Sequence, residues 1–260
     1  NNTVVEVIEN EEDFTTDRLV AMDILHQPER VIIEYNGMWL VSNFEKMQLP
    51  TGWGVEQQIT CVDGSTFQMY MANMKSIFMD MIKNTDMVIF NRCKKEDPLP
   101  TYRRGIKVAN QRAEVIFEDE EGELGDIFQD EMPFDMNAPV IEILPEDYGI
   151  WFVDAMDHPE NYEGKTVKFK ARVMKPRGMG SKFFVPGRTA MTCCADDTTF
   201  LGYVCKSAYA PKLTPGEWVE VTAKVGIEKR NEYQGEEGIV LAAEHVEQCD
   251  PLEDEMVYFN

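Results

Sequence analysis

The sequence predicts an α/β domain followed by an all-β domain, and three observations lead to this fold class. Strand and helix patterns alternate in the first half, short strands separated by Gly/Pro turns fill the second half, and an acidic stretch of weak periodicity at 118–137 separates the halves. Alternating strands and helices are typical of a parallel sheet with crossover helices. We therefore expect one domain at residues 1–137 and another at residues 138–260.

Composition limits the classes of function. The chain has 260 residues and a formal net charge of -22, which argues against a protein that coats nucleic acid or an anionic membrane. No apolar run approaches the roughly 18 residues of a membrane span. The six cysteines are irregularly spaced, and no secretory segment precedes them. We expect a cytoplasmic protein in a reducing compartment, without membrane insertion.

The predicted first domain is organised around a buried strand at residues 31–37, VIIEYNG. Three β-branched residues lead into Glu34, and Gly37 follows three residues later. Ligands bind outside the carboxyl ends of parallel strands, and a glycine there lets backbone approach a phosphate closely. This pattern suits a magnesium nucleotide site, while the alternative is a strand followed by an ordinary turn.

The remaining elements of the first half follow from periodicity and capping residues. A helix should begin at Thr15 or Thr16, and residues 65–84 show the strongest helical pattern, with a methionine-rich stripe expected in the core. Further segments are predicted as strands at 3–8, 55–61, 87–90 and 114–118, and as a basic helix at 102–110. The polar ends EYNG and NRCK should then lie at the same edge of the sheet.

VIIEYNG, TCVDGSTF and DMVIFNRC, in this order, resemble a CobW-type GTPase, the metallochaperone-associated branch of the P-loop GTPases, over about residues 1–118. The resemblance implies a site for GTP with Mg²⁺. In it Glu34 would be catalytic by orienting a water on magnesium, Gly37 would contact the γ-phosphate, and Asn91 with Arg92 would face the base. Lys94 stands where the family carries its guanine-binding aspartate.

Two motifs of that family, the GxxxxGK[ST] loop and the CxCC metal motif, are not in this chain. We therefore expect the natural gene to extend upstream. We also expect the 260-residue chain alone to bind GTP weakly, because the amide and lysine contacts to phosphate are missing.

Short strand patterns predict a five-stranded barrel of the OB type in the second half, after a helix near 147–156. The strands are expected at 167–173, 182–192, 200–206, 218–227 and 238–246. The segment 164–195 contains basic residues and no acid. It is interpreted either as a groove for an anion or single-stranded nucleic acid, or as a solvated barrel exterior.

Adjacent cysteines suggest the last chemical site. Cys193 and Cys194, with Cys205, Cys249 and His245, form a thiolate-rich zinc site if the barrel brings them together. The alternative is a set of free buried cysteines. Adjacent residues of a strand point to opposite faces, so we expect no bound metal in the isolated chain.

PENYEGKTVKFKARV, CCAD at 193–196 and EWVEVTAKV resemble the C-terminal domain of a bacterial permease-associated family of unknown function, over about residues 140–260. Together the two resemblances imply a CobW-like GTP-binding protein in metal handling, with a protein client or a transporter as partner. One alternative is a non-catalytic interaction module associated with a permease. Another is an OB-fold nucleic-acid binder, which the charge disfavours.

Overall fold

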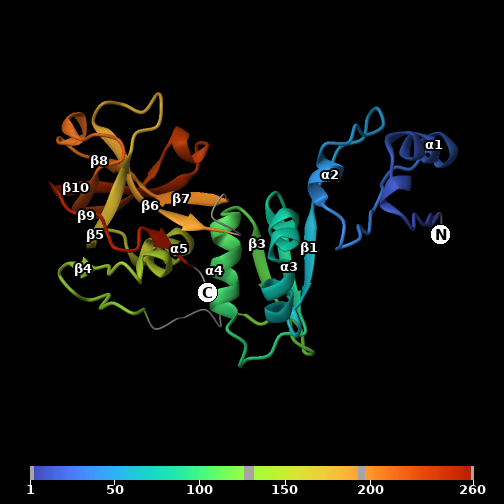
Figure 1. Cartoon of the computed structure of the whole chain (residues 1–260), viewed down its shortest axis with the longest axis horizontal. Coiled ribbons are helices and arrows are strands. Elements are labelled where there is room, and N and C mark those ends of the chain that lie inside the picture. The colour runs from blue at the N-terminus through green and yellow to red at the C-terminus, as the bar shows by residue number, and fades with distance from the viewer. Residues whose placement is uncertain (1–2, 126–131, 193–196, 259–260) are drawn as a thin grey trace. The chain divides into compact units, whose positions relative to one another are not determined.

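A computed structural model describes residues 3–125, 132–192 and 197–258 (Figure 1). The chain forms two compact units. Unit 1 comprises Asn1–Lys95 and Arg112–Gly125, and unit 2 comprises Glu96–Gln111 and Asp126–Asn260.

A three-stranded parallel sheet forms the centre of unit 1, in the order β1-β2-β3. Its elements are β1 (Ile59–Asp63), β2 (Met87–Asn91) and β3 (Glu114–Phe117), with α3 (Phe67–Ile82) between the first two strands. The N-terminal part contributes η1 (Glu11–Asp13), α1 (Thr16–His26) and α2 (Val41–Glu45). The sequence prediction of a parallel α/β arrangement is confirmed for residues 59–117, whereas a P-loop GTPase fold is not shown.

The predicted cap of α1 is confirmed, and the predicted core face of α3 is confirmed in part. The Thr15 side chain accepts a hydrogen bond from the backbone N–H of Arg18 and so caps α1. On α3, Phe67, Phe78 and Ile82 are buried, as the helical pattern predicts. The methionine stripe is less regular than expected, because Met69 is exposed and the backbone of α3 is non-helical at Met74.

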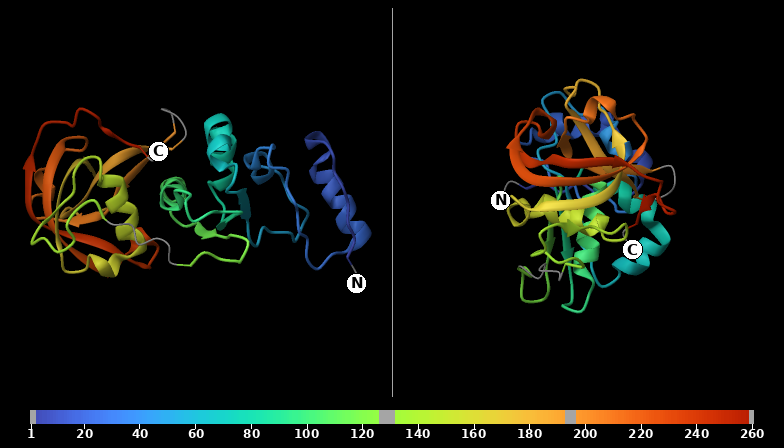
Figure 2. Two further views of the ribbon diagram at one scale, coloured as in Figure 1. Left: turned by 90° about the horizontal axis from the view of Figure 1, so that it is seen from below. Right: turned by 90° about the vertical axis from the view of Figure 1, so that its left-hand side faces the viewer.

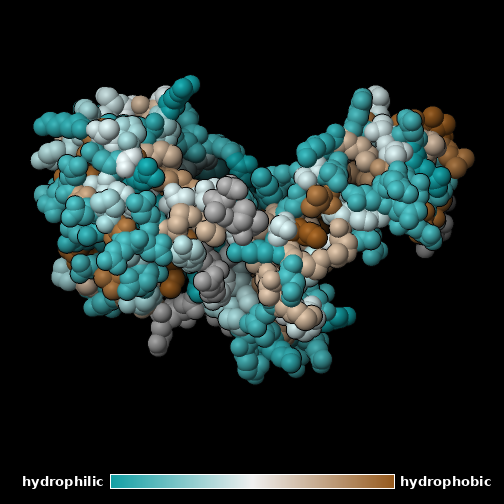
Figure 3. Space-filling model, in the orientation of Figure 1, coloured by the Kyte–Doolittle hydropathy of each residue, from teal (hydrophilic) through white to brown (hydrophobic). Residues whose placement is uncertain are grey.

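The predicted strands at 31–37 and 3–8 are wrong. Residues 30–36 belong to no helix or sheet among the described residues, and the side chain of Ile32 is 88% exposed. Val5, in the segment 3–8, is likewise 81% exposed. Exposed apolar residues are visible over the N-terminal part near α1 (Figure 3). β-branched residues favour an extended backbone, but a strand also needs a neighbouring strand to pair with, and neither segment has one.

Unit 2 is built on a closed barrel of five strands, as predicted. The ring runs β5-β6-β8-β10-β9 and closes by pairing of β5 with β6. Its members are β5 (Thr166–Met174), β6 (Phe183–Met191), β8 (Val204–Lys206), β9 (Trp218–Lys229) and β10 (Glu237–Gln248). Additional strands are β4 (Ile141–Glu142) on β5, and β7 (Thr198–Gly202) and β11 (Met256–Val257) on β6. Figure 2 shows the long, curved strands β9 and β10.

Helices complete unit 2. They are α4 (Leu99–Ala109), α5 (Tyr148–Asp157) and the short η2 (Pro159–Asn161), η3 (Ala210–Lys212) and η4 (Asn231–Tyr233). Although α4 lies between β2 and β3 in the sequence, it clusters with unit 2. Apolar and ionic contacts both join α4 to this unit: Val108 belongs to its buried core, Asp157 of α5 accepts a hydrogen bond from Arg103, and Lys107 Nζ lies 3.6 Å from Asp157 Oδ1.

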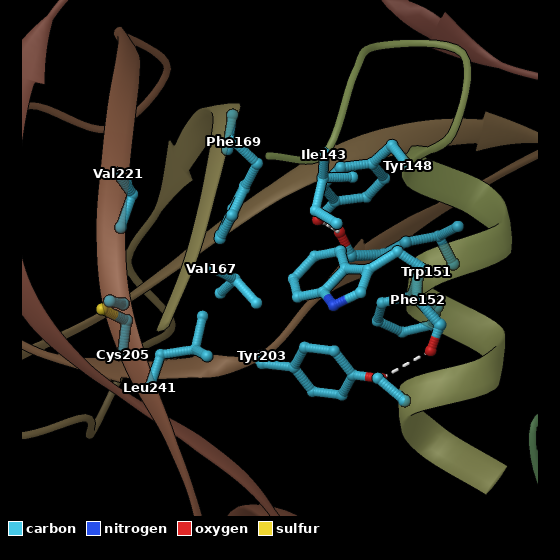
Figure 4. Close-up of a cluster of buried hydrophobic side chains, with 14 of the residues drawn as sticks. Ile143, Tyr148, Trp151, Phe152, Val167, Phe169, Tyr203, Cys205, Val221 and Leu241 are labelled. Atoms are coloured by element: carbon cyan, nitrogen blue, oxygen red, sulfur yellow. Dashed lines mark hydrogen bonds between the residues drawn. The ribbon is translucent and has the colours of Figure 1, made fainter. Parts of the chain in front are cut away.

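Aromatic side chains of α5 and β5, and Tyr203 between β7 and β8, pack together in the buried core of unit 2 (Figure 4). The ring centroids of Trp151 and Phe169 are 4.8 Å apart, and those of Trp151 and Tyr203 are 5.7 Å apart. The Tyr203 hydroxyl donates to the carbonyl of Phe152, so this buried polar group is satisfied. Burial of these side chains stabilises the barrel, and the loops after β5 and β9 lie outside this core.

Candidate functional site: a cleft at the barrel rim

The residues of the predicted nucleotide site are only partly brought together. Asn91 is the last residue of β2 and pairs with Asp63, the last residue of β1. Arg92 follows with φ 55°, and its Nη1 donates to Asp63 Oδ2 at 2.6 Å. Glu34 is exposed on an extended segment that joins no sheet, so the expectation that EYNG and NRCK end at one sheet edge is wrong. Gly37 accepts a hydrogen bond from the Tyr70 hydroxyl at 3.3 Å.

A compact polar cluster does form at the ends of β1 and β2. The hydrogen bond from the Ser65 hydroxyl is the main cause that lowers the pKa of Asp63, and Arg92 adds to it. A side chain at Gly64 would come within 2.8 Å of Cys93 Sγ, so the turn requires glycine. The Oδ1 atom of Asn91 is buried and has no partner in the described part of the chain. The roles of Glu34, Gly37, Asn91 and Arg92 toward GTP and Mg²⁺ stay predictions.

The predicted zinc ligands are tested only in part. Cys193 and Cys194 lie outside the described residues. Cys205 is fully buried, and burial raises the pKa of its thiol to about 12, so it stays protonated. Among the residues that the structure describes, no three His, Cys, Asp or Glu side chains lie together as metal ligands. Zinc binding through the cysteine pair stays a prediction.

Most basic side chains of the segment 164–195 are used inside the protein. They bind as follows: Lys165 to Met136 O, Lys168 to Glu220, Arg172 to Gly216 O, Lys175 to Ala210 O and Leu213 O, and Arg188 to the carbonyls of Pro145, Asp254 and Met256. Arg188 is only 2% exposed. A continuous positive surface is therefore not formed, and the basic side chains of this segment that have no such partner among the described residues are Lys170, Arg177 and Lys182.

A cleft of about 670 Å³ lies at the rim of the barrel, between the β5–β6 loop and the β9–β10 loop. The first loop contributes Arg177, and the end of β9 contributes Lys229. The other lining residues are Pro176, Gly178, Met179, Gly180, Phe183, Arg230, Asn231, Glu232 and Gly235. Two cationic side chains, one from the β5–β6 loop and one from the end of β9, thus line the same hollow, and neither forms an ion pair with a carboxylate of the described residues.

Both loops are anchored at their bases. Lys175 Nζ donates to the carbonyls of Ala210 and Leu213 at 2.6 and 2.5 Å, which ties the first loop to η3. The hydroxyl of Tyr233 accepts from the backbone N–H of Val204 and donates to the carbonyl of Ile239, which ties the second loop to β8 and β10. The cleft is therefore preformed, and ordering its loops costs a ligand little.

The centre of the cleft is a stacked cation. The guanidinium carbon of Arg230 lies 4.3 Å from the centroid of the Phe183 ring. Glu232 accepts from Arg230 Nε at 3.2 Å and from Nη2 at 2.9 Å, a bidentate pair. This pair raises the pKa of Arg230 and lowers that of Glu232. Both groups are therefore charged near neutral pH.

The sequence pattern indicates the basic segment 164–195 but not the cleft. Arg230, Glu232 and Tyr233 lie outside that segment, in a loop that the strand pattern only delimits. A signal was present in the glycines of both loops, because Gly178 and Gly235 adopt φ 86° and 87° and shape tight turns. Only the tertiary structure shows that the two loops face one another.

No helix in the described part of the chain is long and apolar enough to cross a lipid bilayer. No curated protein matches the chain. Among solved structures, the mitochondrial single-stranded DNA-binding protein Rim1 of S. cerevisiae is 10% identical, with 34% of this chain and 97% of that chain covered and a TM-score of 0.21. A putative aspartyl-tRNA synthetase of Leishmania major Friedlin is 18% identical, over 44% of this chain and 21% of that chain, with a TM-score of 0.25.

The aspartyl-tRNA synthetase of Entamoeba histolytica is 15% identical, over 45% of this chain and 27% of that chain, with a TM-score of 0.24. Likenesses this weak say nothing about what the chain binds. A family assignment comes instead from the sequence: the DUF1980 C-terminal domain matches residues 123–259, which include the whole barrel and both loops of the cleft. Because this match spans more than half of the 260 residues, the chain belongs to the family described as the DUF1980 C-terminal domain.

Proposed function

We propose that the chain is a non-catalytic binding protein whose barrel, of the OB type, holds a small anion in the rim cleft. One observation carries the proposal: Arg177 of the β5–β6 loop and Lys229 at the end of β9 line the same cleft, and neither forms an ion pair with a described carboxylate. The anionic group is a carboxylate or a phosphate, since both accept hydrogen bonds from cationic side chains.

The position of the cleft supports this function by analogy. In OB barrels ligands bind on the face of the second and third strands and at the loops after the first and fourth strands. In chain order, the barrel strands are β5, β6, β8, β9 and β10. The cleft lies between the loop after the first of them, β5, and the loop after the fourth, β9, with Phe183 at the start of the second, β6.

Charge and size favour a small ligand over a nucleic acid. The net charge of -22 repels a long polyanion, whereas at physiological salt a compact anion responds mainly to charges within about 8 Å. A volume of about 670 Å³ falls within the roughly 300–1,000 Å³ of small-molecule sites. Phe183 is the only aromatic residue among the described lining residues, too few to stack a run of bases.

The lining residues also argue against catalysis at this cleft. They include no histidine, cysteine or serine. The pKa of Glu232 is lowered rather than raised toward neutrality, so it is a poor general base at physiological pH. GTP-controlled metal handling, which the CobW resemblance implies, stays a separate prediction for unit 1, as does a client protein or transporter as partner.

Calorimetric titration of the full chain with inorganic phosphate and, separately, with citrate tests the proposal. We expect binding of one or both, and a loss of about tenfold or more for Arg177→Ala/Lys229→Ala, since each charge-assisted hydrogen bond contributes roughly 1.5–3 kcal/mol. Lys83→Ala/Lys224→Ala removes the same charge from exposed positions outside the cleft and should leave the affinity unchanged. Equal losses in both variants, or no binding at all, would refute the proposal.

A further inference from the structure

We infer that the ligand of the rim cleft carries a planar ring beside its anionic group, and that the ring stacks on the guanidinium of Arg230. The inference rests on the proposed function and names the class of ligand for the same cleft. Nucleoside monophosphates and aromatic carboxylates share this chemistry.

Glu232 occupies the edge of the Arg230 guanidinium that carries Nε and Nη2. The remaining nitrogen, Nη1, lies 3.7 Å from Glu228 Oε2. A ligand anion therefore gains little from this edge, and its charge is directed to Arg177 and Lys229 instead. What Arg230 still offers to the cleft is a face of its planar group.

One face of that plane is covered and held. Phe183 lies against it at 4.3 Å, and the carboxylate pair keeps the guanidinium from rotating. A Cβ atom at Gly180 would lie 3.4 Å from the Phe183 ring, so the first loop in turn packs on that ring. Phe183 thus packs near both Gly180 and Arg230, and the Arg230 side chain, which is 17% exposed, lines the cleft.

The planar guanidinium of Arg230 is a suitable surface for the ring of a ligand. Planar guanidinium groups stack on aromatic faces, while an ammonium group acts as a point charge. Because the charge of Arg230 is balanced by Glu232, the contact selects ligands by shape and polarizability more than by charge. Arg177 and Lys229 supply the anion contacts within the same cleft.

The test compares adenosine monophosphate with ribose 5-phosphate, and indole-3-acetate with acetate, in titrations of the full chain. We expect the member with a ring to bind about tenfold more tightly in at least one pair, as stacking contributes about that factor. Arg230→Lys keeps the charge and removes the planar group, so it should abolish the preference for the member with a ring. The pair that shows the preference identifies the source of the ring.

Phe183→Leu removes the support of the guanidinium but keeps an apolar side chain, and it should reduce the preference as well. Thermal unfolding of each variant checks that the barrel is intact.

If phosphate binds but the wild type shows no preference for a ring, or if Arg230→Lys retains this preference in a folded barrel, the inference is wrong while the proposed function stands. If no anion binds, both are wrong. Tighter binding of a single-stranded decanucleotide than of adenosine monophosphate would overturn the assignment to a small ligand.

Discussion

The ring of Tyr233 lies over the backbone of Gly238, so close that a Cβ atom at Gly238 would come within 2.5 Å of the ring. This approach brings the tyrosine hydroxyl between two strands, where it accepts from Val204 N–H at 3.2 Å and donates to Ile239 O at 2.5 Å. The second loop of the cleft is therefore fixed by one side chain.

Tyr233→Phe should destabilise unit 2 by about 1–3 kcal/mol, because the partly buried N–H of Val204 loses its acceptor. Native-state hydrogen exchange of the barrel amides measures this. Tyr209→Phe is the control, since Tyr209 is 51% exposed and its hydroxyl should be satisfied by water. Equal stability of Tyr233→Phe and wild type would show that the hydroxyl does not hold the loop.

Two glycine substitutions should have opposite effects. At Gly187 of β6 a Cβ atom would collide with the carbonyl of Leu201 and lie 2.5 Å from the Phe200 ring, so Gly187→Ala should destabilise the barrel by about 3 kcal/mol or prevent folding. Gly105 lies inside α4 with open space around it. Gly105→Ala should stabilise α4 by about 0.5–1 kcal/mol. Chemical denaturation distinguishes the signs, and a stable Gly187→Ala barrel would contradict the strand packing.

Removal of Asp157 should release α4 from unit 2. Arg103 and Lys107 both contact this carboxylate, which is 8% exposed. Asp157→Ala removes the partner of two partly buried cations, so it should lower the free energy of unfolding by about 2 kcal/mol or more. Hydrogen exchange in α4 should become faster. Glu220→Ala breaks the more exposed pair with Lys168 and should cost less than about 1 kcal/mol. Unchanged exchange in α4 after loss of Asp157 would place its anchor elsewhere.

The carboxyl of Asp63 should titrate below its ordinary value of 3.8. Ser65→Ala and Arg92→Gln should each raise this pKa, because the Ser65 side-chain hydrogen bond is its largest lowering cause and Arg92 lowers it through both a hydrogen bond and its charge. A lowered folded-state pKa means that the contribution of Asp63 to stability is present above the unfolded value and is lost as the pH falls through the folded one. Carboxyl-carbon NMR titration compares the wild type with both variants. An unchanged pKa in either variant would contradict these causes.

The barrel strands were predictable because their signal is local. In β5, Val167, Phe169, Ala171 and Val173 are buried and alternate with polar residues, the pattern of a strand with one face in the core. The pattern is the same whichever strand lies alongside. It therefore predicts both the strand and its buried face.

The failure at residues 31–37 has the opposite cause. The segment contains three β-branched residues typical of a buried strand, Val31, Ile32 and Ile33. Their burial, however, depends on a neighbouring strand that the local pattern does not specify. The cleft was missed for a related reason. Whether a basic side chain is free, like Arg177, or bound to carbonyls, like Arg188, is decided by residues far away in the sequence.

Backbone amide NMR of the full chain during titration with inorganic phosphate tests the central claim most directly. Binding in the rim cleft should shift the amide signals of Gly178, Gly180 and Gly235 first and saturably, because these residues line the cleft, with smaller changes at the amides of the β1 and β2 ends. Arg177→Ala/Lys229→Ala should remove the shifts. Saturable shifts confined to Ser65 and Arg92, or none in either loop of the cleft, would contradict the account.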